Sequence, residues 1–128
     1  MVTCSHSLIG EWAQDAGLEL QVQGPSRQLS VTVDRVRVHL LELPSKGILI
    51  ESRIMDLPLN PLDRDRMVRR AMGFSVGRLR DSSAALVADA QASCLMLQRQ
   101  LIDPSSARQV GTAIEQLVNE VDLWRAAL

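Results

Sequence analysis

The chain has 128 residues, of which 46% are hydrophobic and 23% are charged, and its formal net charge at pH 7 is −1. This length fits one domain, residues 1–128, whose core can bury about two-thirds of the surface of the unfolded chain. The balanced charge excludes a bulk attraction to nucleic acid or anionic membranes, and no apolar run approaches the roughly 18 residues that span a bilayer.

Apolar residues near the N-terminus follow a helical period and predict a short amphipathic helix. Gly17 is placed to end this helix at the C′ position. The next segment, Leu18–Val22, alternates between apolar and polar residues and predicts a short strand or an extended connector. The apolar stripe of the helix consists of Leu8, Ile9, Trp12, Ala13 and Ala16.

Three closely spaced segments between Leu29 and Leu57 have a hydrophobic period of two, which is typical of half-buried strands. The pair Asp34-Arg35 predicts a tight turn or a bulge between the first two, and Pro44–Gly47 predicts a turn between the second and third. Connections this short cannot make parallel crossovers, so we expect an antiparallel meander.

Asn60-Pro61 is a helix start, because Asn is a favoured N-cap and Pro suits the first helical position. Gly73 and Gly77 leave the end of this helix open. The segments Ala84–Ala88 and Cys94–Leu101 then predict a hairpin across residues 89–92. Asp103-Pro104 is again an N-cap residue followed by Pro at the first helical position, and it predicts the start of the final helix. The final helix carries a regular stripe formed by Val110, Ala113, Ile114, Leu117, Val121 and Trp124.

The order of these elements predicts an α+β fold of the form α-β-β-β-α-β-β-α. An antiparallel meander and a short strand pair would pack against three helices. With two Trp, one Phe and no Tyr, the core must be aliphatic.

No group of residues predicts catalysis or metal binding. The two cysteines form no short motif, the two histidines have no paired spacing, and no nucleophile has a base beside it in a known pattern. We therefore expect no catalytic residue, no metal, no cofactor and no enzymatic activity. Two widely separated cysteines also make a reducing compartment, the cytoplasm, the default location.

The chain resembles the class I type III secretion chaperones, the Tir chaperone CesT/SycE-like family, over nearly its whole length. The order and spacing of the elements carry the resemblance, and the final helix has an acidic residue, a Trp and a basic residue close together, as that family often does: Asp122, Trp124 and Arg125. The other matching parts are the helix ending at Gly17, the meander Leu29–Leu57, MDLPLNPLDRDRMVRRAM, Ala84–Ala88, CLMLQRQLID and EQLVNEVDLWRAAL.

The resemblance implies a cytoplasmic bacterial homodimer involved in virulence. It would bind an extended segment near the N-terminus of a secreted effector and deliver the complex to the secretion ATPase, without inserting into a membrane. By analogy, the dimer contact uses the second helix and the following strand, through Met67, Val68, Ala71, Met72, Phe74, Leu86 and Val87. The surface or support of the effector sites would be formed by Leu8, Trp12, Leu29, Val31, Val33, Val38, Leu40, Leu49 and Ile50.

The faces of the meander and the basic cluster each allow two interpretations. The chain's own helices could cover both faces of the meander, or one face could receive an apolar partner segment. The basic cluster between Arg64 and Arg80 could make the protein a nucleic-acid-binding or regulatory protein. It could instead be a solvated face with ion pairs such as Asp65 with Arg69, and we favour this reading. The cluster consists of Arg64, Arg66, Arg69, Arg70, Arg78 and Arg80.

Overall fold

The computed structural model of the protein describes residues 4–23, 28–44, 47–89, 91 and 93–128. The predicted turn residues 24–26, 45–46, 90 and 92 lie outside the described residues. The α+β element order confirms the predicted fold class. In chain order the elements are α1 (Cys4–Asp15), β1 (Gln21–Gln23), β2 (Gln28–Val33), β3 (Val36–Glu42), β4 (Ile48–Asp56), α2 (Pro61–Arg78), β5 (Ala85–Ala88), β6 (Cys94–Leu101) and α3 (Ala107–Ala127).

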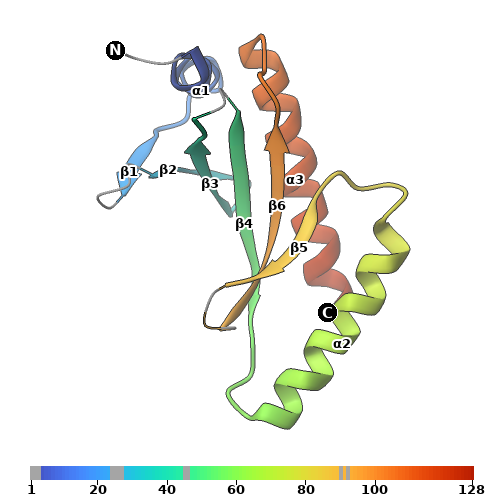
Figure 1. Cartoon of the computed structure of the whole chain (residues 1–128). Coiled ribbons are helices and arrows are strands. Elements are labelled where there is room, and N and C mark those ends of the chain that lie inside the picture. Colours follow the sequence, from blue (N-terminus) through green and yellow to red (C-terminus); the bar gives the residue numbers. More distant parts are fainter. Residues whose placement is uncertain (1–3, 24–27, 45–46, 90, 92) are drawn as a thin grey trace.

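The strands form one antiparallel sheet in the order β1-β2-β3-β4-β6-β5 (Figure 1). The meander is therefore confirmed, and the C-terminal hairpin extends it because β6 pairs with β4 along its whole length. Asp34 and Arg35 make a tight turn rather than a bulge. Their φ values of 49° and 69° are those of a two-residue hairpin turn, and Val33 pairs with Val36 beside it.

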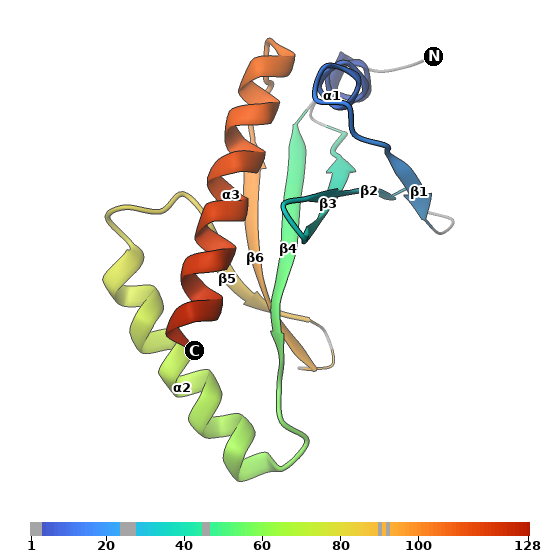
Figure 2. The ribbon, with the colours of Figure 1, turned by 180° about the vertical axis from the view of Figure 1, so that it is seen from behind.

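The two faces of the sheet differ in what covers them. Figure 1 looks at the face over which none of the three described helices lies, and Figure 2 shows α3 lying across the opposite face, with α1 beside its N-terminal end. In β4, the side chains of Ile48, Ile50 and Ile54 point to the covered face and are buried, whereas Leu49 points to the other face and is only partly buried. A bulge between Arg53 and Met55 interrupts the alternation at the end of the strand, so Met55 packs against the core. We call these the covered face and the open face.

The end of α1 follows from one glycine. Gly17 has a φ of 69°, which L side chains rarely adopt, and its amide donates to the carbonyl of Gln14 at 3.2 Å. The amide of Leu18 donates to the carbonyl of Ala13 at 2.8 Å. These two bonds make a Schellman motif, which confirms the predicted helix end.

Both later helices have side-chain caps at their N-termini. The side chain of Asn60 accepts from the amide of Leu62 at 2.9 Å, as predicted for α2. The predicted start of α3 at Asp103-Pro104 is wrong, because Asp103 has a φ of 45° and α3 begins at Ala107. An N-cap needs an extended backbone, and Ser106 supplies it with φ −151° and ψ 155°.

Close contact between α1 and α3 depends on Gly111. A Cβ atom at this buried position would lie 2.7 Å from Cδ1 and 2.8 Å from Nε1 of Trp12. The missing side chain therefore lets the indole ring lie directly on the backbone of α3. Trp12 joins α1 to the core while staying partly exposed.

We expect Gly111→Ala to destabilise the protein by about 1–3 kcal/mol, because the new methyl group must displace the indole of Trp12. The measurement is urea-induced unfolding followed by circular dichroism. The matched control is Gly73→Ala, an exposed helical position where an added Cβ meets nothing within 4 Å. That control should be neutral or stabilising by up to about 1 kcal/mol. Equal stability of the two variants would contradict the proposed contact.

Candidate protein-binding surfaces

The nine predicted effector residues lie in two different environments. Five of them belong to the buried core on the covered face, so they can support a binding surface only from beneath: Leu29, Val31, Val38, Leu40 and Ile50. The other four keep exposed surface: Leu8, Trp12, Val33 and Leu49. The sequence pattern placed both groups on strands or helices correctly but could not separate them.

The open face carries an apolar pair beside a polar centre. Leu49 of β4 lies opposite Leu41 of β3, and both side chains are partly buried. The neighbouring Glu51 carboxylate accepts from the side-chain amides of Gln28 at 3.2 Å and Gln98 at 2.9 Å. Glu51 is thereby fixed across three strands, and the Leu41–Leu49 pair is the apolar part of this face.

His39 lies opposite Glu51 on the same face. Burial lowers the pKa of His39, and it outweighs the opposing effect of the Glu51 carboxylate. The imidazole is therefore neutral at neutral pH, and the negative charge of Glu51 is not cancelled by a charged histidine.

The inner side of α2 contacts the protein's own core. Ala71 is fully buried, and Met67 and Val68 pack against the core cluster. The rings of Phe74 and Trp124 lie 4.7 Å apart, centroid to centroid, at 86° in an edge-to-face arrangement. Four of the residues predicted for the dimer contact therefore make contacts within the chain.

The outer side of α2 is apolar and exposed. Met72, Val76 and Leu79 are 58%, 68% and 75% exposed and follow one another at helical spacing. The side chains of Leu62, in the first turn of the helix, and Leu59, just before the helix, are exposed as well. Only Met72 was among the predicted dimer residues. The predicted set lacks Val76 and Leu79 because Gly73 and Gly77 hide the end of the helix in the sequence, whereas the stripe continues past Gly73.

The other predicted dimer residues lie on β5, which forms one edge of the sheet. Leu86 lies opposite Leu97 and Val87 lies opposite Met96 on β6. Because successive strand residues alternate between faces, Leu86 points to the covered face and Val87 to the open face. Both side chains are partly buried.

The basic cluster on α2 is partly committed to contacts within the chain. Arg78 donates two hydrogen bonds to the carboxylate of Glu120 on α3, at 2.9 and 2.8 Å. Arg70 donates to the backbone carbonyl of Ala127 at 3.0 Å. Arg69 makes the predicted ion pair with Asp65 at 3.1 Å, on an exposed surface. Of the six arginines, two therefore bind α2 to α3 and a third forms an ion pair within α2.

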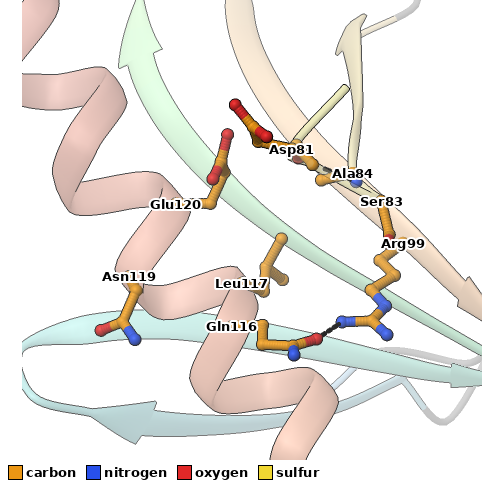
Figure 3. A pocket seen from close by; sticks show the side chains of 9 residues that line it. Asp81, Ser83, Ala84, Arg99, Gln116, Leu117, Asn119 and Glu120 are labelled. Atoms are coloured by element: carbon orange, nitrogen blue, oxygen red, sulfur yellow. Dashed lines mark hydrogen bonds between the residues drawn. The ribbon is translucent and has the colours of Figure 1, made fainter. Parts of the chain in front are cut away.

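A polar pocket of about 240 Å³ lies beside the Arg78–Glu120 contact (Figure 3). It is bounded by β6, by α3 and by the segment that follows α2. Asp81, Ser83 and Glu120 line one part of it, and the guanidinium of Arg99 donates to the side-chain oxygen of Gln116 in another. Among the described residues, no cluster of His, Cys, Asp and Glu is arranged to hold a metal ion. Nor is any helix of this part of the chain long and apolar enough to cross a membrane.

Residues 7–125 match the model of the Tir chaperone protein (CesT) family. No curated protein sequence gives a significant match to the chain.

Solved structures share the fold. The Yersinia pestis type III secretion chaperone SycH, crystallised with a stable fragment of YscM2, is 20% identical with a TM-score of 0.65, over 94% of this chain and 98% of that chain. A chain of the ExsC–ExsE complex is 18% identical with a TM-score of 0.70, over 94% of this chain and 90% of that chain. A chain of the ExoT–SpcS complex from Pseudomonas aeruginosa is 17% identical with a TM-score of 0.67, over 94% of this chain and 97% of that chain. At these identities the likeness shows the fold alone.

The contact between Arg78 and Glu120 predicts a pH dependence of stability. Hydrogen bonds from Arg78 hold the pKa of Glu120 below its usual value, so the pair stabilises the fold at neutral pH. This contribution starts to fall near the unfolded pKa of about 4.3 and is lost as the pH drops through the lower folded pKa.

We expect Glu120→Gln to lower the urea midpoint at pH 7 and to lose less additional stability between pH 6 and pH 3 than the wild type. The control is Asp65→Asn, which removes an exposed ion pair of small energetic value and should leave the pH profile nearly unchanged. Parallel profiles of the wild type and Glu120→Gln would show that the pair does not couple stability to pH.

Proposed function

The chain belongs to the Tir chaperone protein (CesT) family, and on this basis we propose that it acts as a type III secretion chaperone. It binds a segment near the N-terminus of one or more secreted effectors, keeps that segment soluble and competent for export, and delivers it to the secretion apparatus, with the secretion ATPase as a further partner. It acts in the bacterial cytoplasm by binding, without catalysis.

The family match over residues 7–125 is the observation that carries this proposal. The surface chemistry supports it, because apolar side chains remain exposed at two separate places, the open face and the outer side of α2. Exposed apolar patches on a small protein mark sites where other proteins bind.

We assign the outer side of α2 to a homodimer contact. The inner side already packs on α3 through Phe74 and Arg78, whereas Met72, Val76 and Leu79 are more than half exposed. In a two-fold symmetric pair the same stripe of each helix would face its counterpart, and Val87 at the sheet edge could extend the contact. This refines the predicted set by adding Val76 and Leu79.

We expect Val76→Asp to convert the dimer into a folded monomer, because the substitution buries an unpaired charge only when two copies associate. Light scattering after size exclusion should give twice 14.1 kDa for the wild type and 14.1 kDa for the variant. Val22→Asp is the matched control, since Val22 is equally exposed but lies on β1, away from α2. It should remain dimeric. A monomeric wild type, or a dimeric Val76→Asp variant, would refute the assignment.

We assign effector contact to the open face and to the exposed part of α1. Leu41 and Leu49 offer an apolar row on the open face, and Leu8 and Trp12 offer partly exposed apolar surface on α1. The five buried residues of the predicted set support these surfaces by holding the strands in place. An extended effector segment can follow such separated patches without folding.

The binding test uses co-expression with the product of the adjacent open reading frame, followed by calorimetry on the purified complex components. Leu49→Ala should weaken binding by about 2 kcal/mol or more if Leu49 is a hot spot. Thr32→Ala changes an exposed polar residue of β2, which β3 separates from β4, and this variant should bind like the wild type. If folded Leu49→Ala protein keeps full affinity, the open face is not the effector site.

A further inference from the structure

A second groove lies along the seam between β6 and α3. It has a volume of about 640 Å³ and runs from the end of β6, past the loop at Pro104, along the first half of α3. It meets the pocket of Figure 3 at Arg99 and Gln116, which line both. It lies on the covered side of the sheet, so it is separate from the open face and from the outer side of α2.

The charge of this groove has one sign. Among the residues that the structure describes, Arg99 and Arg108 are the only ionisable ones that line it, and neither Asp103 nor Glu115 does. A guanidinium carries five N–H donors, and Gln116 accepts from one of those of Arg99. Arg108 is exposed. The groove therefore presents cationic donors to an incoming anion.

The rim of the groove is apolar and includes a free strand edge. Ile102 is 84% exposed, and the partly buried Leu101 lies next to it. β5 pairs only with residues 95–98 of β6, whereas β4 pairs with β6 as far as Leu101. Within the described residues, no strand pairs with the β5 side of residues 99–101. An extended chain can add there through backbone hydrogen bonds.

We propose that this groove binds an extended protein segment that carries an acidic and an aliphatic residue two positions apart. Its backbone would add to the free edge of β6, its carboxylates would meet Arg99 and Arg108, and its aliphatic side chains would cover Leu101 and Ile102. A spacing of two is required because Arg99 and Leu101 lie two residues apart on the covered face, opposite Ile50 and Ile48, and every second side chain of an added strand points to that face. This site goes beyond the proposed effector contact and does not depend on it.

The test is an NMR titration of the ¹⁵N-labelled full chain with a short blocked peptide in which aspartate and leucine lie two positions apart, separated by threonine. We expect shift changes at the amides of residues 99–102 and 108–116. Arg108→Gln should weaken binding about threefold, and the double variant Arg99→Gln/Arg108→Gln about tenfold. Arg66→Gln removes the same charge from an exposed position on α2 and should change binding less than about twofold.

Two modified peptides and two competing anions test what the groove recognises. A peptide with asparagine in place of aspartate, or one N-methylated at alternate backbone positions, should bind much more weakly. Binding of either peptide at full strength, equal affinity of Arg108→Gln and wild type, or shifts confined to other surfaces would overturn the proposal. So would displacement of the peptide by inorganic phosphate or by a single-stranded oligonucleotide at lower concentration, because the groove would then be a general anion or nucleic-acid site.

The two proposals can fail separately. Loss of effector binding in Leu49→Ala tests the open face and leaves the β6–α3 groove untouched. Conversely, an Arg108→Gln variant that loses the acidic peptide but still binds the effector at full strength would support two independent sites.

Discussion

Packing of α3 on one face of the sheet is the constraint on which the rest of the structure depends. Its buried stripe contributes Val110, Ile114 and Leu117 to the core, each at most 1% exposed. The other two helices are positioned through α3 as well. Helix α1 contacts α3 where Trp12 lies on Gly111. Helix α2 contacts α3 through the Phe74–Trp124 ring pair and the hydrogen bonds from Arg78 to Glu120. Most of the favourable energy of this arrangement comes from apolar burial.

This single-sided packing explains why binding surfaces remain. Because α1 and α3 both lie on the covered face, the open face keeps only strand side chains, with Glu51 fixed between Gln28 and Gln98 beside an apolar pair. Because α2 uses its inner side to contact α3, its outer stripe of Met72, Val76 and Leu79 stays exposed. A small domain of this shape has too few helices to cover every apolar surface, and association with other chains can complete the burial.

Local signals in the sequence predicted local structure well. Gly17 ends α1, Asp34-Arg35 makes the turn of the β2–β3 hairpin, and Asn60 caps α2, each for the reason anticipated. The end of α2 could not be predicted. A glycine inside a helix costs only about 1 kcal/mol, so contacts with α3 beyond Gly73 are sufficient to continue the helix to Arg78. The predicted start of α3 at Asp103-Pro104 is wrong because Asp103 has a φ of 45°, whereas Ser106 has the extended backbone that an N-cap needs.

Hydrophobic periodicity and local capping signals were enough to predict the fold class, the order of the elements and the alternating faces of the strands. Which face is covered follows from long-range packing, which buries Leu40 and Ile50 in the core and leaves Leu49 with exposed surface. The same packing decides which side of α2 is free, and it brings Arg99 and Arg108 together along one groove. The reason is physical: hydrophobic periodicity is a local property that separates two faces, whereas coverage depends on contacts between segments distant in the chain.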